Sequence, residues 1–295
     1  MKSISFTDKL NDGCSKLELS YIDDNVKISN GSTVRLKFNN SNIFYGVVFK
    51  HDKNSKKEIT VTAYDQLRYA KTKDTIVCRN DTVTTLVSRM CNYFGLKKGV
   101  LANTGYSLPT GIQDDKTWLD IIYSSISDTL MNTGKKYCLR DEFGSIALRD
   151  LNDLQLNLVL GDESLVYDYD YEKSIDDEFY NQIKIYVKGN DNASVGSFVS
   201  TKDEDSIKKY GLLQYFEAVE NENSSQAKSK ADTLLRLYNH EVESLSLKCL
   251  GDTRVRAGSS FYGQIGDISL NKRLIVKSVT HDFLPTHTMT LEVAI

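Results

Sequence analysis

The sequence is short of several residue types, and each shortage excludes something. It has two prolines, four histidines and one tryptophan among 295 residues, and its five cysteines form no Cys-x-x-Cys pair. Five widely spaced cysteines provide neither a disulfide framework nor a zinc motif. Two prolines rule out proline-rich linkers. What is abundant is tyrosine, with 17 copies, and tyrosine favours β-structure.

Charge and hydropathy indicate an ordinary soluble globular protein. The net charge is −3, with 26% charged and 40% hydrophobic residues. No run rich in lysine and arginine provides a nucleic-acid binding site. The start of the chain lacks the apolar core of a signal peptide, and no apolar run reaches membrane-spanning length. We therefore expect a protein that is made and stays soluble in the cytosol, with no membrane segment.

Motifs of catalysis and cofactor binding are missing. There is no glycine-rich phosphate loop, no Gly-x-Gly-x-x-Gly and no His-Glu-x-x-His, and Gly258-Ser259-Ser260 does not fit the Gly-x-Ser-x-Gly elbow. His281 and His287 could flank a turn and bind a metal, but no carboxylate or cysteine spacing supports this, so an ordinary surface role is favoured. We expect no enzyme activity, no catalytic residue, no cofactor and no metal.

The chain contains an internal repeat. Gly31-Ser32 is followed by an apolar strand that ends at His51-Asp52, and Gly258-Ser259 is followed by another that ends at His281-Asp282. Nine residues after each histidine, Thr60 and Thr290 begin strands of alternating pattern. Any two antiparallel meanders share glycine turns and alternation, but the matched spacing favours a true duplication.

Periodicity divides the chain into three parts. Residues 1–78 read as strands of a first β-barrel module, with turn signals at Asn39-Asn40. Residues 79–152 predict an α/β insert. It has a helix starting after Asn80 or Asp81 and ending at Gly95, a second from about 116 to 131 stopped by Gly134, and a hairpin turning at residues 141–144. Residues 153–295 predict a second β-barrel module, with a polar loop at 189–196 and a helix at about 225–239 capped by Ser224 or Ser225. The predicted fold is α+β, mainly β, with two related antiparallel barrels.

An acidic, tyrosine-rich stretch offers the best case for chemistry. Between residues 162 and 178, carboxylates interleave with Tyr167, Tyr169 and Tyr171. Glycoside hydrolysis needs two carboxylates beside a sugar platform, and this stretch contains both residue types. However, Asp168, Asp170 and Glu172 alternate with the tyrosines as on a strand with one wet and one buried face. A solvated or inter-subunit face is the favoured reading.

Several segments, in order along the chain, resemble the baseplate hub proteins of contractile phage tails and tail-like particles, the PBSX-like hub family. They are Thr62-Ala63-Tyr64-Asp65-Gln66-Leu67-Arg68-Tyr69, Leu160-Gly161-Asp162-Glu163-Ser164-Leu165, Tyr180-Asn181-Gln182-Ile183, Gly211-Leu212-Leu213-Gln214-Tyr215-Phe216-Glu217 and Cys249-Leu250-Gly251-Asp252 with Arg254-Val255-Arg256-Ala257-Gly258. The similarity covers nearly the whole chain.

The resemblance implies a structural role. Such hubs are similar to the T4 tail hub and to the N-terminal part of type VI secretion spike proteins, in which each subunit carries two related barrels and three subunits form a ring. Two modules in each of three chains would present six near-equivalent faces and adapt a six-fold tail tube to a three-fold spike.

The implied partners are further copies of the chain in a homotrimer, the tail tube protein, the central spike protein, other baseplate proteins and the tape-measure protein. We expect synthesis in the bacterial cytoplasm and assembly in the baseplate of a virion or tail-like bacteriocin, with the insert facing baseplate or spike proteins. Acidic side chains would line the axial channel. The alternatives are a tail-associated peptidoglycan hydrolase that uses Asp168 and Glu172, and a carbohydrate-binding module that uses Tyr169.

Overall fold

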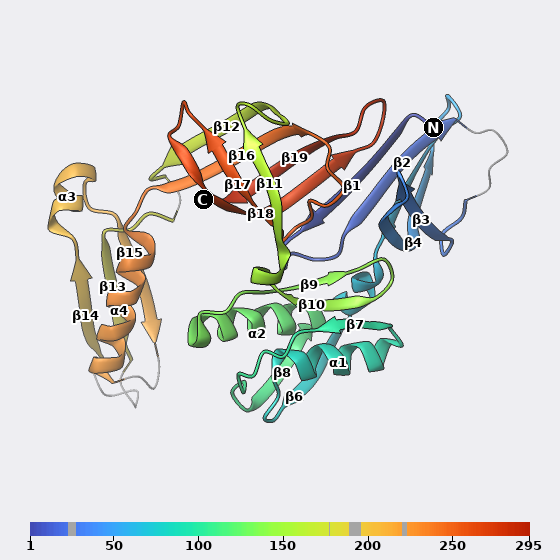
Figure 1. Cartoon of the computed structure of the whole chain (residues 1–295). Helices are drawn as coiled ribbons and strands as arrows, with labels where there is room; N and C mark the ends of the chain where they lie inside the picture. Colours follow the sequence, from blue (N-terminus) through green and yellow to red (C-terminus); the bar gives the residue numbers. More distant parts are fainter. Residues whose placement is uncertain (23–27, 177, 189–195, 220–222) are drawn as a thin grey trace. The chain divides into compact units, whose positions relative to one another are not determined.

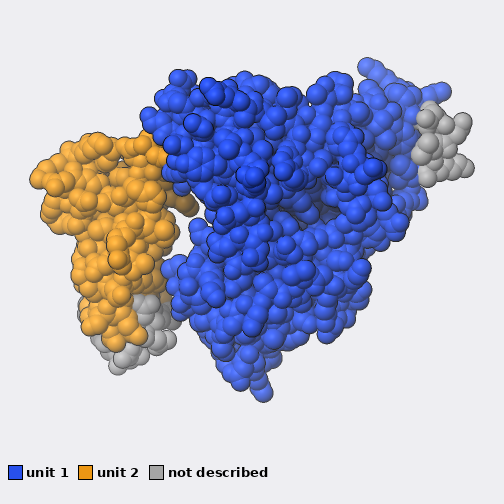
Figure 2. All heavy atoms as spheres, in the orientation of Figure 1, with its two compact units in different colours: residues 1–170, 245–295 blue, residues 171–244 orange. Residues whose placement is uncertain are grey.

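The computed structural model describes residues 1–22, 28–176, 178–188, 196–219 and 223–295. The chain forms two compact units, residues 1–170 with 245–295, and residues 171–244 (Figure 2). Within the described residues, no helix combines the length and apolar character that crossing a membrane requires. The predicted module boundaries after residues 78 and 152 stay a prediction.

One sheet of eleven strands dominates the described chain (Figure 1). Its order is β12-β16-β19-β18-β1-β2-β5-β4-β3, and β17 joins β11 to β18. The strands are β1 (Ser3–Lys9), β2 (Lys16–Ile22), β3 (Thr33–Phe38), β4 (Ser41–Lys53), β5 (Glu58–Tyr64), β11 (Gln155–Gly161), β12 (Val166–Ser174), β16 (Val242–Leu250), β17 (Ser260–Ile265), β18 (Leu270–Asp282) and β19 (Thr288–Ala294).

The prediction of a mainly β fold with antiparallel sheets is confirmed. The two predicted barrels are not, because the described strands close no barrel. Instead, β1 pairs with β2 along one edge and with β18 along the other, which joins the N-terminal and C-terminal strand sets in one sheet. A strand shared in this way removes two edges that would otherwise stay unpaired.

Residues 66–154, which contain the insert predicted at 79–152, pack two helices on two small sheets around one apolar cluster, and the name insert is used below for this whole part. Its elements are the 3₁₀ helix η1 (Gln66–Lys71), β6 (Lys73–Cys78), α1 (Val83–Phe94), β7 (Lys98–Leu101), β8 (Gly111–Thr117), α2 (Trp118–Thr133), β9 (Tyr137–Asp141), β10 (Ile146–Asp150) and the 3₁₀ helix η2 (Leu151–Leu154). The sheets are β7-β10-β9 and β6-β8.

The sequence predicted the C-terminal ends of both helices correctly. Both end where glycine was expected, since Gly95 and Gly134 adopt the left-handed conformation that glycine tolerates best. The start of α1 was predicted one residue or more too early, because Thr82 is its cap. The hydroxyl of Thr82 accepts from the amide of Thr85, and the hydroxyl of Thr85 accepts from that of Thr82, which closes a capping box.

The second unit is a three-stranded sheet, β14-β13-β15, covered by a helix (Figure 1). Its elements are β13 (Gln182–Val187), β14 (Ser197–Lys202), α3 (Glu204–Tyr210), β15 (Gln214–Val219) and α4 (Ser224–Tyr238). The helix predicted at 225–239 is therefore present, with Ala227 and Ala231 buried and Asn223 as its cap instead of the serines. Most of the loop predicted at 189–196 lies outside the described residues.

The internal repeat appears in the strand order. The N-terminal set runs β2-β5-β4-β3 and the C-terminal set runs β16-β19-β18-β17. In the two sets β4 and β18 are each 13 residues long. Strand β4 shifts register against β5 between Val48 and Lys50, and β18 shifts register against β19 between Val276 and Ser278. Two sets with the same strand order, the same long strand and the same bulge support the predicted duplication.

The glycine turns of the two sets have matching hydrogen bonds. The amide of Gly31 donates to the carbonyl of Val48 at 2.8 Å, and the amide of Val48 donates to the carbonyl of Ser32 at 2.9 Å. The amide of Gly258 donates to the carbonyl of Val276 at 2.9 Å, and the amide of Val276 donates to the carbonyl of Ser259 at 2.9 Å. Both glycines have positive φ, 87° and 84°, which explains why glycine stands at the start of each copy.

The strand pairings correct one part of the predicted alignment. His51 lies opposite Val61 in the first copy, and the corresponding pair in the second copy is Val279 opposite Leu291. His281 therefore corresponds to Lys53, two residues beyond His51. The two His-Asp pairs are a coincidence of spacing, whereas the glycine turns and the threonine strands are true equivalents.

Candidate functional site

A cluster of buried charges lies where three parts of the first unit meet. Arg256, from the loop between β16 and β17, donates through Nε to Asp8 of β1 at 2.8 Å and through Nη1 to the carbonyl of Asp141 at 2.8 Å. Asp8 also accepts from the hydroxyl of Ser15 at 2.9 Å. We call Asp8, Asp65, Asp141 and Arg256 the charged joint. It connects the N-terminal strands, the insert and the C-terminal strands.

The other two carboxylates of the charged joint hold backbone turns. Asp65 accepts from the amides of Ser15 and Leu67, each at 2.9 Å, and caps η1. Asp141 accepts from the amide of Gln66 at 3.3 Å and from that of Gly144 in the β9–β10 turn. Each carboxylate therefore ties the entry of the insert to another segment of the chain.

Burial sets the electrostatics of the charged joint. Asp65 and Asp141 are only 2% and 4% exposed. Burial is the main cause that raises the pKa of Asp65 to about 7, with a further contribution from the charge of Asp141. Burial likewise raises the pKa of Asp141 to about 6, against the hydrogen bonds from Gly144 and Gln66 that favour its charged form. One guanidinium therefore faces three carboxylates, and it pairs directly with Asp8.

The sequence analysis singled out segments that contain two of the four residues of the charged joint. Asp65 and Arg256 lie within two of the segments that carry the family resemblance, but nothing paired them. Asp8 and Asp141 were missed. Asp8 had a signal, because it stands two residues after the buried Phe6 on a strand and so must point inward. An inward aspartate on a strand requires a buried partner.

His281 and His287 were expected at the surface, and this is wrong for His281, which is 2% exposed. Its Nε2 lies 2.9 Å from the carbonyl of Val255, so Nε2 carries the proton and donates. Nδ1 then accepts from Nε2 of His287 at 3.0 Å. Burial lowers the pKa of His281 to about 4 and also lowers the pKa of His287. The pair is neutral and packs on Phe6 and Phe283.

Strand β12 carries the acidic, tyrosine-rich stretch, and its alternation is as predicted from Asp168 onward. Asp168, Asp170 and Glu172 are exposed, while Tyr169 and Tyr171 are half-buried; Tyr167 is an exception, at 59% exposed. Asp168 accepts from Nζ of Lys248 on β16 at 2.7 Å, and this hydrogen bond holds the pKa of Asp168 below its ordinary value. Asp177 lies outside the described residues.

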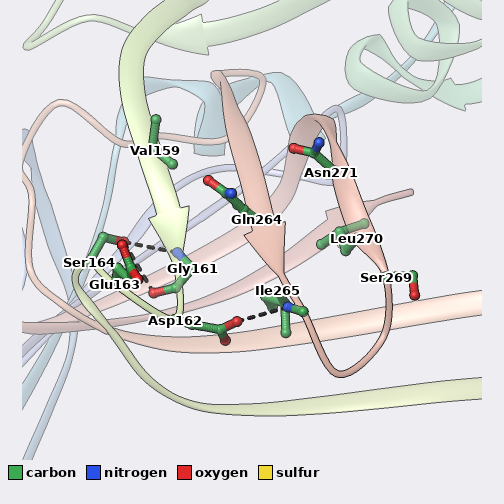
Figure 3. Close-up of a pocket in the computed structure, with 11 residues that line it drawn as sticks. Val159, Gly161, Asp162, Glu163, Ser164, Gln264, Ile265, Ser269, Leu270 and Asn271 are labelled. Carbon is green, nitrogen blue, oxygen red and sulfur yellow. Dashed lines mark hydrogen bonds between the residues drawn. The ribbon is translucent and has the colours of Figure 1, made fainter.

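A surface groove of about 570 Å³ runs between the end of β11 and the β17–β18 turn (Figure 3). Asp162 accepts from the amide of Gly266 at 2.8 Å, and Ser164 accepts from the amide of Gly161 at 2.9 Å (Figure 3). Ser164 therefore closes the turn after β11, and Asp162 ties the end of β11 to the β17–β18 turn. The described lining contains no histidine, cysteine, lysine or arginine, and Ser164 and Asp162 are both hydrogen-bonded to backbone amides.

Potential metal ligands are dispersed in the described chain, and most of its cysteines are buried. No group of three or more histidine, cysteine or carboxylate side chains there could hold a metal ion. The described cysteines are free, and burial raises the pKa of four of them to about 11 or 12, so their thiols are unreactive. The most distinctive features of the described chain are the long sheet and the buried ion pairs of the charged joint.

Comparison with known structures first defines the class of fold. The 43 kDa tail protein of prophage MuSo2 from Shewanella oneidensis matches with a TM-score of 0.71 at 12% identity, over 99% of this chain and 94% of that protein. An E. coli component of the type VI secretion system, similar in structure to T4 tail proteins gp27 and gp5, matches with a TM-score of 0.57 at 11% identity, over 99% of this chain and 72% of that protein. The fold is that of these tail proteins.

Sequence comparison then gives the family. The chain is 30% identical over 271 residues to the phage-like element PBSX protein XkdQ of Bacillus subtilis, which covers 90% of this chain and 82% of that protein. The YQBQ-like family matches residues 4–294. The chain therefore belongs to the YQBQ-like family, and the predicted resemblance to PBSX-type proteins is confirmed.

Proposed function

We propose that this protein is a structural component of a tail baseplate and acts there as the hub. In this role three copies form a ring that adapts a six-fold tail tube to a three-fold spike. The similarity to XkdQ of a phage-like element and the fold shared with tail proteins support a baseplate role. The role requires shape and stable contacts and needs no catalytic centre.

The observation that carries this proposal is the repeat within the large sheet. Each chain contains two strand sets with the same order, the same bulge and the same hydrogen bonds at the glycine turn. Three chains with two sets each would present six similar faces while keeping three-fold symmetry. A protein that lacked the repeat could match one symmetry but not both.

The proposed partners follow from this position in the particle. They are two further copies of the chain, the tail tube protein on one side, the central spike protein on the other, and other baseplate proteins around them. The tape-measure protein would pass through the ring. We place the assembled protein in the baseplate of a virion or a tail-like bacteriocin, after synthesis in the bacterial cytoplasm.

The geometry gives little support to the hydrolase alternative. Asp168 and Glu172 lie four residues apart on one strand, which separates their Cα atoms by about 13 Å. Paired carboxylates in glycoside hydrolases are separated by about 5–9.5 Å. Asp168 is in addition held by Lys248. No observation favours a sugar site at Tyr169, whose hydroxyl donates to Asp267 at 3.3 Å.

The test is the mass of the purified chain by light scattering, alone and mixed with candidate tail tube and spike proteins. We expect a trimer in at least one mixture. A monomer under every condition would contradict the hub proposal. Zymography on peptidoglycan with wild type and Asp168→Asn/Glu172→Gln should show no lysis for either, and lysis that only wild type produces would establish the hydrolase instead.

A further inference from the structure

The two copies of the repeat differ at one edge. In the C-terminal copy, β18 pairs with β17 up to Ile275, and from Ser278 to Asp282 the same side of β18 pairs with β1. In the N-terminal copy, β4 pairs with β3 up to Val47. From Lys50 to Asp52 the described chain places no strand on that side of β4.

The N-terminal and C-terminal copies also differ at the opposite end of the sheet. Strand β1 lies between β2 and β18, whereas β12 pairs with β16 and forms the end of the sheet in the described chain (Figure 1). Because β2 and β16 correspond, β12 stands where β1 stands in the other copy. From this we infer that β12 of one chain pairs with the second half of β4 in a neighbouring chain, as β1 pairs with β18 within one chain.

The register of this contact follows from equivalent side chains. Ser3 of β1 contacts Ser20 of β2 at 2.7 Å between hydroxyls, and Asp168 of β12 contacts Lys248 of β16 at 2.7 Å. Ser20 lies opposite Thr60, and Lys248 lies opposite the equivalent Thr290. Asp168 therefore corresponds to Ser3, and counting along the strands makes Glu172 the equivalent of Thr7.

One pair identifies the contact best. Thr7 lies opposite Thr280, and their hydroxyls are 3.2 Å apart. Thr280 lies opposite Thr290, as Asp52 lies opposite Thr60, so Asp52 is the equivalent of Thr280. Between two chains, Glu172 should therefore lie opposite Asp52, with Lys50 as its diagonal neighbour on the same face.

The exposed charges of β12 and of the second half of β4 also support the pairing between chains. Strand β12 exposes Asp168, Asp170 and Glu172, whereas β4 and the turn after it expose Lys50, Lys53, Lys56 and Lys57. Lys50 pairs with Asp52 at 2.7 Å, which neutralises the one carboxylate that faces Glu172. Asp168 is likewise paired, with Lys248, so the contrast in net charge rests on Asp170 and Glu172 at one edge and on Lys56 and Lys57 near the other. Head-to-tail contacts of this kind build a closed ring when the rotation between neighbouring chains closes.

The experiment uses two full-length variants, Asp52→Cys and Glu172→Cys, co-expressed so that one assembly can contain both, then purified and oxidised. Opposite positions on antiparallel strands fall within the Cα separation that a disulfide tolerates. We expect a shift to the mass of two chains on a non-reducing gel in the co-expressed pair, and no such shift in either variant alone or in wild type. Asp52→Cys co-expressed with Asp168→Cys, four residues out of register, is the matched control and should not shift.

The inference rests on the proposed trimer, and the outcomes separate the two. If wild type is a trimer by light scattering but the co-expressed pair gives no covalent dimer, or gives no more than the control pair, the strand pairing is wrong and the hub stands. If wild type is a monomer with and without the spike and tube proteins, and no crosslink forms, both fail. A crosslink specific to Asp52 and Glu172 supports both.

Discussion

The two strand sets of the large sheet have the same strand order, but their equivalent residues lie in different surroundings. In the C-terminal set, the edge of β18 is paired with β1, and Val279 and His281 of β18 are buried. In the N-terminal set, the equivalent His51 is half-buried and Lys53 is exposed. A duplicated fold can thus use one copy for a contact inside the chain and leave the other copy for a contact between chains.

The glycine turns differ in the same way. Arg256 stands two residues before the turn at Gly258 and reaches Asp8 and the insert. At Gly31, by contrast, no atom of the described residues lies within 4 Å of the position where a Cβ would stand. The C-terminal turn is therefore part of the charged joint, and the N-terminal turn is solvent-facing. Substitutions at equivalent positions of the two turns should show how much stability is lost by disturbing the shared turn backbone and how much is lost by disturbing the charged joint.

The largest expected effect comes from removing the cation of the charged joint. Arg256→Met leaves Asp8, whose side chain is 4% exposed, without its ion-pair partner. We expect a loss of about 3–5 kcal/mol in the free energy of unfolding. Chemical denaturation followed by the fluorescence of Trp118, which is buried in the insert, measures it.

Arg254→Met is the matched control, two residues away. The side chain of Arg254 is 58% exposed and pairs with Asp252, so its removal should cost less than about 1 kcal/mol. Equal unfolding midpoints for the two variants would show that the charged joint contributes nothing specific.

Local structure was predictable where a few neighbouring residues decide it. The apolar spacing of Val83, Leu86, Val87 and Met90 placed α1, and Asn39-Asn40 placed the β3–β4 turn, where both asparagines have positive φ. The glycines at residues 31 and 258 marked both copies of the repeat. In each case the determining residues lie within about two turns of a helix or one hairpin.

The charged joint was not predictable, because its members are separated by up to 248 positions, as for Asp8 and Arg256. The periodicity of apolar residues indicates which face of a strand is buried, but not which strand pairs with it. For this reason the pairing of β1 with both strand sets was not predicted either. The burial of His281 follows from that same pairing, since Phe6 of β1 stacks on its ring. Tertiary pairing, not local propensity, decided these points.

A smaller effect should separate the two glycine turns. Gly31→Ala and Gly258→Ala both place a side chain at positive φ, which costs about 1 kcal/mol each. A Cβ at Gly258 would in addition lie 3.1 Å from Sγ of Cys138, and crowding of this kind costs about 1–3 kcal/mol more. Thermal or chemical unfolding of the two variants gives the difference.

Cys138→Ala provides the check on that prediction. If crowding causes the extra loss, Gly258→Ala combined with Cys138→Ala should lose less than the sum of the two single changes. Strict additivity would mean that Cys138 is not the cause, and the asymmetry between the turns would then need another origin.

The pH dependence of stability should expose the charged joint further. The pKa of Asp65 rises from its ordinary value of 3.8 to about 7 on folding, so the folded chain holds this proton where the unfolded chain has lost it. Stability from this group is fully present below about pH 4 and declines until about pH 7, by at most about 1.4 kcal/mol per pH unit. Asp65→Asn should therefore be less sensitive to pH across that window, as measured by denaturation at several pH values. A variant as sensitive as wild type would contradict the shift.

His281 should act in the opposite direction over part of the same window. Its pKa falls from 6.5 to about 4 on folding, so the unfolded chain gains a proton below pH 6.5 while the folded chain stays neutral, and stability declines as pH falls toward 4. His281→Gln keeps a donor for the carbonyl of Val255 but cannot titrate. The advantage of wild type over this variant should grow as pH rises from 4 to 6.5, whereas its advantage over Asp65→Asn should shrink. Parallel changes for both variants would show that the two groups do not titrate as their burial requires.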